Sequence, residues 1–178
     1  LKRDGLSGRD AAFASRIAYG VMQNRIYLDR CLARCLTQRP EKLEPLLLDI
    51  LRIGAYQILF MDKVPVNAAV NEAVEMAKAH KLSRATGLVN AMLRNVDRRR
   101  GEPLAFADEL EALSVQTSHP RALVERMVGL LGAEEAEAFL RADNEPVPTT
   151  IQTNTLKTTE KQLCASLEDE SVTAEPHP

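Results

Sequence analysis

The sequence has few aromatic residues and no tryptophan. Phe, Trp and Tyr together make up 4% of its 178 residues, whereas apolar residues as a whole make up 45%. A core of this composition must consist mainly of Leu, Val, Ile, Ala and Met, which suits helices better than sheets. The 27% of charged residues is typical of a globular protein, and the length fits one medium domain or two small ones.

Long apolar runs are also missing. The most apolar stretch, residues 46–61, is interrupted by Asp49 and Arg52, and no apolar signal segment follows the first residues. We therefore expect a soluble chain with no membrane span and no secretion. The chain has only three cysteines, and an odd, low number gives no disulfide framework. This fits a reducing compartment and a cytoplasmic location.

Glycine is scarce where a cofactor pocket would need it. The eight glycines form no G-x-G-x-x-G or P-loop pattern, and none of them follows Gly132. A nucleotide or adenosyl cofactor needs such a loop at the end of a strand. We therefore expect no cofactor-binding residue in this chain.

Metal ligands and catalytic residues are equally hard to place. Cys31 and Cys35 lie four residues apart on one helical face, as two metal ligands would. They fall within a stripe of leucines with no third ligand nearby in sequence, which favours buried structural cysteines. His80, His119 and His177 are scattered. We predict no catalytic residue and no metal site in the chain.

The net charge of −2 conceals an uneven distribution. Residues 1–100 contain 18 Lys and Arg against 10 Asp and Glu, whereas residues 101–178 contain 5 against 15. A basic half joined to an acidic half predicts two modules with different partners. The alternative is a chance split between two ordinary solvated surfaces, because charge alone does not prove nucleic-acid binding.

The basic half has the apolar period of helices. A candidate cap at Ser7 precedes the first helix, in which Gly20 permits the close approach of a neighbour. The third helix is apolar on most sides, as expected of the buried centre of a bundle. Asn67 and Ser83 are candidate N-caps of the fourth and fifth helices. The pattern predicts a helical bundle over residues 1–101, with helices at about 7–21, 27–36, 44–61, 67–77 and 83–96.

The acidic half, residues 102–178, mixes helical and extended patterns. Alternation in residues 149–153 predicts one β-strand, and Thr159 with Gln162 forms a possible capping box. Because one strand cannot form a sheet alone, we expect a small, incomplete α+β segment within a mainly α chain. Its short helices are expected at about residues 105–113, 120–131, 134–142 and 159–169.

The basic residues are the strongest positive signal. Phosphates need cations spaced along a surface, and the planar guanidinium of Arg adds bidentate contacts. Some of these side chains must be ordinary solvated positions or partners of nearby acids. The candidate RNA-binding residues are Arg9, Arg16, Arg25, Arg30, Lys78, Lys81, Arg84, Arg94, Arg98, Arg99 and Arg100.

Several segments resemble a known family. The stretches that resemble the NusB-type RNA-binding fold are Ser7–Phe13, Tyr19–Met22, Arg52–Leu59, Val64–Val74 and Gly87–Arg94. Those that resemble the RsmB (Sun/Fmu) methyltransferases are Ser118–Pro120, Asn144–Pro146 and Thr149–Thr158. The resemblance covers nearly the whole chain. It implies the N-terminal part of an S-adenosylmethionine-dependent enzyme that methylates carbon 5 of a cytosine in 16S rRNA, which would be its partner.

The chain departs from the family pattern in two places. Gln152 stands where the family has Arg, and the chain is expected to stop before the family's catalytic domain, which supplies the cofactor loop and the cysteine nucleophile. Cys164 lacks the Pro-Cys setting of that nucleophile, so its role is not carried over. The acidic half would pack on that domain in cis. We expect the chain to bind RNA and to transfer no methyl group.

Two other functions stay open at this point. A stand-alone NusB-type module would act in transcription antitermination, binding RNA together with a ribosomal protein, and the segment from Ser118 onward argues against it. A helical adaptor that binds only protein is the third possibility, and the charge asymmetry argues against it. Only the two RNA-binding functions predict an affinity for RNA that falls with salt.

Overall fold

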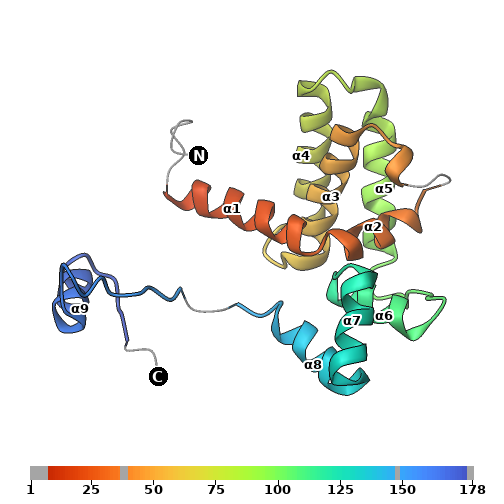
Figure 1. Cartoon of the computed structure of the whole chain (residues 1–178). Helices are drawn as coiled ribbons and strands as arrows, with labels where there is room; N and C mark the ends of the chain where they lie inside the picture. The colour runs from red at the N-terminus through yellow and green to blue at the C-terminus, as the bar shows by residue number, and fades with distance from the viewer. Residues whose placement is uncertain (1–7, 37–39, 147–148, 176–178) are drawn as a thin grey trace. The chain divides into compact units, whose positions relative to one another are not determined.

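The computed structural model describes residues 8–36, 40–146 and 149–175, and the regular elements within these ranges are helices (Figure 1). The mainly α class is confirmed. Two short 3₁₀ helices, η2 (Pro40–Lys42) and η3 (Ser83–Ala85), join longer elements. The α-helices are α1 (Gly8–Gln23), α2 (Arg25–Ala33), α3 (Pro45–Phe60), α4 (Val66–Ala79), α5 (Thr86–Arg98), α6 (Glu109–Thr117), α7 (Arg121–Leu131), α8 (Ala133–Ala142) and α9 (Glu160–Asp169).

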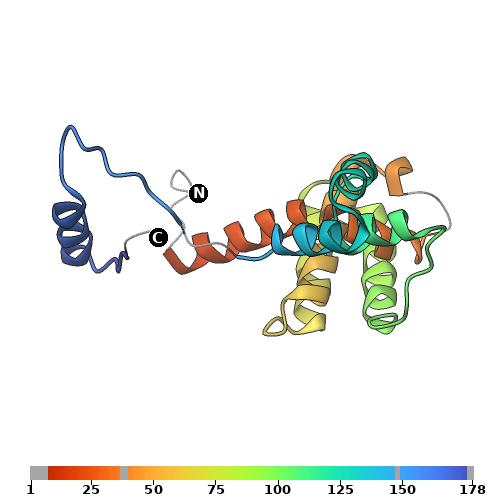
Figure 2. The same cartoon turned by 60° about the horizontal axis from the view of Figure 1, so that its bottom comes forward.

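Helix α3 is the centre of a first compact unit that extends to Asn144. It packs against α1, α2, α4 and α5, and Figures 1 and 2 show α4 and α5 standing beside it. Leu51 and Ala55 are fully buried, and Ile58 is nearly so. The central position predicted from its apolar circumference is therefore confirmed.

Two glycines allow neighbouring helices to approach α3 closely. A Cβ added at Gly54 of α3 would lie 2.5 Å from Cδ1 of Leu93 on α5. A Cβ added at Gly20 of α1 would overlap the ring of Tyr56 on α3. The close approach predicted at Gly20 is thus confirmed, and Tyr56 is the neighbour.

One arginine ties α2 to α3. Nε and Nη2 of Arg52 donate to the two carboxylate oxygens of Asp29, each at 2.8 Å, and Nη1 donates to Asp49 Oδ1 at 2.9 Å. The hydrogen bond that Arg52 donates to Asp29 raises the pKa of Arg52. Because the Arg52 side chain is only 16% exposed, this bidentate pair is better shielded from water than an ordinary surface pair.

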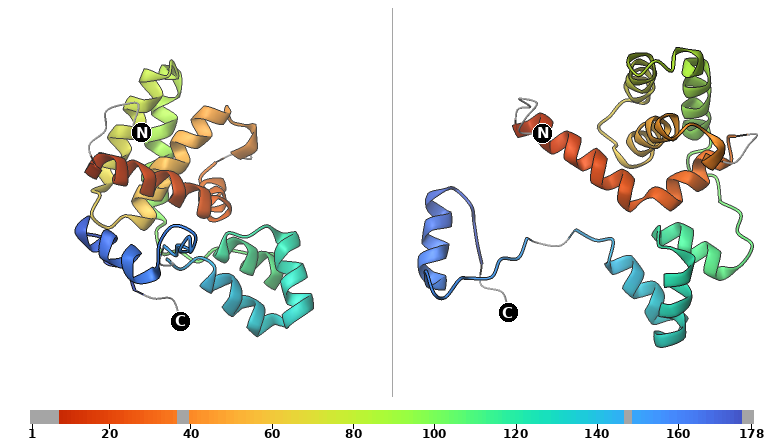
Figure 3. Two further views of the ribbon diagram at one scale, coloured as in Figure 1. Left: turned by 60° about the vertical axis from the view of Figure 1, so that its left-hand side comes forward. Right: turned by 45° about the horizontal axis from the view of Figure 1, so that its top comes forward.

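Helices α6, α7 and α8 belong to the same unit, and Figure 3 shows them as a group next to α2. The backbone N–H of Ile26 donates to Ser118 Oγ at 3.0 Å, and Gln23 Nε2 donates to the carbonyl of Asn144 at 2.9 Å. The compact unit therefore continues past residue 101. The division into residues 1–101 and 102–178 stays a sequence-based prediction.

The predicted helix starts are less accurate than the predicted helices. The N-cap of α4 is Pro65, not Asn67, because the fixed φ of proline (−62°) already suits a helix start. Ser83 opens η3, and α5 begins three residues later. The helix predicted at 105–113 begins after Asp108, whose carboxylate accepts from Glu111 N–H. The candidate cap Ser7 lies outside the described residues.

The second unit, from Glu145, contains α9. The strand predicted at residues 149–153 is wrong, because these residues have no regular structure and no described segment supplies a partner strand. The capping box is confirmed: Thr159 N–H donates to Gln162 Oε1 at 3.0 Å, and Gln162 N–H donates to Thr159 Oγ1. None of the helices that the structure describes is long and apolar enough to cross a membrane.

Candidate nucleic-acid interface

Three arginines lie on a background of small residues along the outer face of α5 and the η3 turn that leads into it, and we call this surface the α5 face. Arg84, Arg94 and Arg98 are exposed, and exposed Gly87 and Ala91 lie between them. The four positions in α5 recur every three or four residues and so share one face of the helix. At about 1.5 Å per residue they span about 16 Å, and Arg84 in η3 precedes them. The face is long enough to follow several phosphates.

Two amide oxygens orient the central arginine of this face. Nε of Arg94 donates to Asn90 Oδ1 at 3.0 Å, and Nη1 lies 3.5 Å from Asn67 Oδ1 on α4. Both partners are neutral amides, so they hold the guanidinium in place without compensating its positive charge. A fixed, uncompensated guanidinium is well suited to bind a phosphate.

The turn between α4 and α5 adds Lys81 next to Arg84 of the α5 face. Lys81 takes a left-handed φ of 64° just after α4, and Arg84 follows in η3. Neither side chain forms an ion pair with a described residue. Lys78 differs, because its Nζ lies 2.7 Å from Glu75 Oε1. Lys78 therefore contributes less net charge than the other two.

Three more candidates lie on α1 and at the start of α2. Arg9, Arg16 and Arg25 are exposed, and none of them pairs with an acid among the described residues. Arg9 and Arg16 are seven residues apart and so lie on one face of α1. The partly buried Ile17 and Val21 of the same helix pack against the core. The structure thus presents these cations to solvent, on a different helix from the α5 face.

Two other candidates are occupied by acids. Arg30 forms an ion pair with Glu111 of α6, and its guanidinium lies 5.9 Å from the centroid of the Phe106 ring. The backbone N–H of Ala107, and then Arg30, lower the pKa of Glu111. Nη2 of Arg100 lies 3.2 Å from Asp62 Oδ1, and both side chains are exposed. Arg30 therefore has a structural role in joining α2 to α6.

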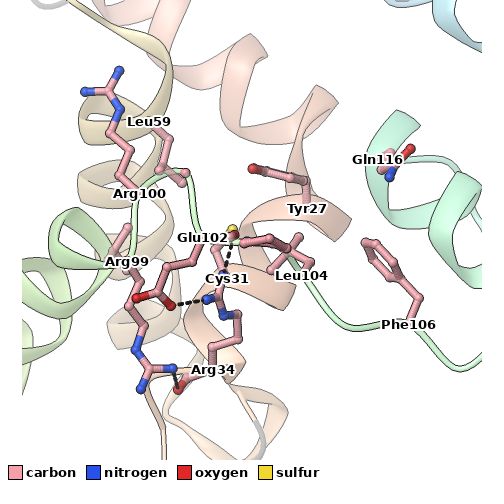
Figure 4. A pocket seen from close by; sticks show the side chains of 13 residues that line it. Tyr27, Cys31, Arg34, Leu59, Arg99, Arg100, Glu102, Leu104, Phe106 and Gln116 are labelled. Atoms are coloured by element: carbon pink, nitrogen blue, oxygen red, sulfur yellow. Dashed lines mark hydrogen bonds and ion pairs between the residues drawn. The ribbon is translucent and has the colours of Figure 1, made fainter.

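The last candidate, Arg99, lines a cavity of about 360 Å³ where α2, the end of α5 and residues 101–106 meet (Figure 4). Its Nη1 donates to the carbonyl oxygen of Arg34 at 3.1 Å, and no acid of the described residues forms an ion pair with it. Arg34 itself pairs with Glu102 at 2.6 Å. Tyr27 and Phe106 form part of the opposite wall.

The cysteines and histidines that the structure describes do not form a reactive centre, and His177 lies outside the described residues. Burial raises the pKa of the Cys31 and Cys35 thiols, which keeps them protonated at neutral pH. Nε2 of His119 lies 3.1 Å from Asp143 Oδ2, which links the start of α7 to the end of α8. His80 is exposed. Among the described residues, no group of His, Cys, Asp and Glu side chains is arranged to hold a metal ion.

Sequence reasoning did not find the cavity. Its aromatic wall combines Tyr27 of α2 with Phe106, which the sequence places in a predicted helix but which lies in the irregular segment before α6. One signal was available, because Leu104 and Phe106 alternate with small residues in a chain that is poor in aromatics. Apolar side chains in such a segment indicate that it packs back on the bundle.

Comparison with known proteins identifies two families along the chain. Residues 1–98 match the model described as NusB family. Residues 119–178 match the model described as Methyltr_RsmF/B-like, ferredoxin-like domain. The resemblance drawn from the sequence, a NusB-like bundle followed by an RsmB-type segment, is confirmed by this order of matches.

Individual relatives agree with both matches. The chain is 32% identical over 177 residues to a probable ribosomal RNA small subunit methyltransferase B of Bacillus subtilis. The matched region covers 98% of this chain and 39% of that relative. It is 33% identical over 175 residues to a protein of the same description from Synechocystis. It is also 34% identical over 93 residues to the transcription antitermination protein NusB of Bacillus licheniformis. The chain thus spans about two fifths of the methyltransferases it matches.

Proposed function

The chain belongs to the NusB family, and from this premise we propose that it is the RNA-binding N-terminal portion of a 16S rRNA cytosine-C5 methyltransferase. In this role it holds or selects ribosomal RNA in the cytoplasm for a catalytic domain that lies elsewhere in the same protein. The observation that carries the proposal is the presence, on one chain, of a NusB bundle and an RsmF/B-like segment.

The α5 face is the main RNA contact in this proposal. Arg84, Arg94 and Arg98 are exposed, and no acid among the described residues pairs with them. Cations placed in this way release counterions from a phosphate backbone, which is the main source of affinity in sequence-independent RNA binding. Lys81 extends the face at one end and Arg99 at the other. Arg9, Arg16 and Arg25 form a second contact on α1 and α2.

S-adenosylmethionine would be the methyl donor of the whole enzyme. The described part of this chain has no strand followed by a glycine-rich loop, and no cysteine in the sequence follows a proline. These residues therefore do not fit the cofactor, and no step of methyl transfer is assigned to them. The contribution of this chain is to bind and orient RNA.

A second function is favoured by one observation. The match to NusB of Bacillus licheniformis covers 72% of that protein, which is described as a transcription antitermination protein. A module of that kind would need no partner domain. Residues 119–178 argue against it, because they match a different family that is named for methyltransferases. A helical adaptor that binds only protein is the third possibility.

The proposal is tested by comparing RNA ligands. Labelled fragments of small-subunit rRNA and structured RNAs of equal length from other sources are titrated with the chain by fluorescence anisotropy. We expect tighter binding to at least one small-subunit fragment and no transfer of methyl groups from labelled S-adenosylmethionine. Equal affinity for all RNAs would contradict a role in rRNA selection. Methylation by this chain alone would contradict the assignment of catalysis to another domain.

A further inference from the structure

We infer that the cavity between α2, the end of α5 and residues 101–106 binds one unpaired nucleotide of the RNA, with its phosphate near Arg99 and its base near Tyr27, Phe106 and Gln116. The inference rests on the proposed function, since it names the part of the RNA that one site takes. It adds a recognition site for a base to a surface that otherwise binds phosphates.

The size and lining of the cavity fit a nucleotide. Its volume is about 360 Å³, within the range of sites for small ligands, which starts at about 300 Å³. Apolar side chains such as Leu59 and Leu104 form much of its wall. A few polar groups complete the lining: the Tyr27 hydroxyl, the Gln116 amide and the guanidinium groups. Such a mixture is typical of sites that hold a flat, partly polar ligand.

The charge of the lining favours an anion. Arg34, Arg99 and Arg100 line the cavity together with one acid, Glu102. Glu102 compensates Arg34, with which it forms an ion pair at 2.6 Å. Arg99 donates to a backbone carbonyl, and its charge therefore stays available. The pair of Arg100 with Asp62 is long and exposed, which makes it easy for a phosphate to displace the carboxylate.

The other side of the cavity fits a base. Figure 4 shows Tyr27, Phe106 and Gln116 on the side opposite Arg99 and Arg100. Unpaired RNA bases are recognised by stacking on aromatic side chains and by hydrogen bonds to their edges. Gln116 offers an amide for such an edge. Its Oε1 accepts one long hydrogen bond, 3.4 Å from Arg141, and no described residue accepts from its Nε2.

The position of the cavity favours a nucleotide within a strand over a free one. Arg98 lies on the outer α5 face and the next residue, Arg99, lines the cavity. A strand that follows the α5 face thus reaches the cavity without a gap in the line of cations. Arg99 and Arg100, which line this side of the cavity, are both exposed to solvent.

The test uses the full chain and a small-subunit rRNA fragment. Arg99→Gln and Gln116→Leu are compared with Arg126→Gln, which removes an exposed cation of α7 that does not line the cavity. We expect about tenfold weaker binding for each cavity variant and little change for the control. Unfolding midpoints of all three variants are measured to establish that they are folded.

Single abasic sites in the RNA identify the bound base. We expect one unpaired position at which loss of the base weakens binding by the wild-type chain about tenfold. The same abasic RNA should bind the Gln116→Leu variant as well as intact RNA does. Cavity variants that keep wild-type affinity and the wild-type abasic profile would overturn the inference. Absence of any RNA binding by the wild-type chain at low salt would instead refute the proposed function.

A thiol gives an independent readout of the same cavity. Cys31 lines it, whereas Cys35, one turn further along, does not. The variant Cys35→Ser/Cys164→Ser leaves Cys31 as the single thiol, and Cys31→Ser/Cys164→Ser leaves Cys35 as its control. We expect saturating RNA to slow alkylation of Cys31 several-fold more than that of Cys35. Equal effects on the two thiols would count against occupation of the cavity.

Discussion

Substitution of Gly54 by Ala tests the packing of α3 on α5. The new methyl would lie 2.5 and 2.9 Å from Cδ1 and Cδ2 of Leu93, which is fully buried. Overpacking of this kind costs about 1–3 kcal/mol, and the helix propensity gained by replacing glycine offsets about 0.5–1 kcal/mol. We therefore expect Gly54→Ala to lower the free energy of unfolding by about 1–2 kcal/mol.

A second substitution separates this clash from other effects. Leu93→Ala alone should cost about 2–5 kcal/mol, because it leaves a cavity in the core. In the double variant Gly54→Ala/Leu93→Ala, the methyl added at position 54 lies in the space that the leucine side chain vacates, so the two losses should not add. We expect a favourable coupling of about 1–3 kcal/mol.

Urea denaturation followed by circular dichroism measures all four proteins. Gly129→Ala in α7 is the matched control, because a Cβ at Gly129 meets no atom within 4 Å. This control should stabilise the chain by up to about 1 kcal/mol. If Gly54→Ala behaves like Gly129→Ala, or if the double variant is simply additive, α3 and α5 do not meet at Gly54 as described.

Three further predictions concern other parts of the chain. Arg52→Met should lower the free energy of unfolding by about 1–3 kcal/mol in urea, because it leaves Asp29 half-buried without its bidentate partner, and an Asp29→Asn background should reduce that loss. Arg121 and the Glu111 N–H lower the pKa of Asp108, so its contribution to the free energy of unfolding should be complete above pH 3.8 and should be lost as the pH falls through the lower folded pKa. Asp108→Asn should therefore make the free energy of unfolding, measured in urea at several acidic pH values, depend less on pH in this range. Helix α9 has no buried residue and spans 10 residues, so its amides should exchange within the dead time of a hydrogen-exchange experiment, and protection equal to that of α3 would contradict this.

The helices of the first unit could be predicted because their apolar residues recur at the helical period and become the buried face. The stripe in α3 and the glycine in α1 indicated a central helix and a close approach, and both were found. Helix starts were predicted less well. Asn67 is a good cap by residue type, but the preceding Pro65 already fixes the backbone for a start. The capping preference of a residue does not decide the helix start where a nearby proline constrains the backbone more strongly.

The candidate site shows a similar limit. Sequence alone places cations on helices but does not show which acids will meet them in space. Arg30 and Glu111 are 81 residues apart, and their ion pair depends on α6 packing against α2. The strand predicted at residues 149–153 failed for a related reason, since alternation predicts a strand only where a partner strand is available.

The most direct test of the account is the salt dependence of binding to a small-subunit rRNA fragment. Log affinity should fall with log salt by about 0.7 for each phosphate neutralised on a single strand. We predict a slope that indicates several contacts, reduced by about two in Arg84→Gln/Arg94→Gln/Arg98→Gln and hardly changed in Arg126→Gln. Binding with the same slope in both variants would contradict an RNA-binding role for the α5 face. No binding even at low salt would favour the adaptor that binds only protein.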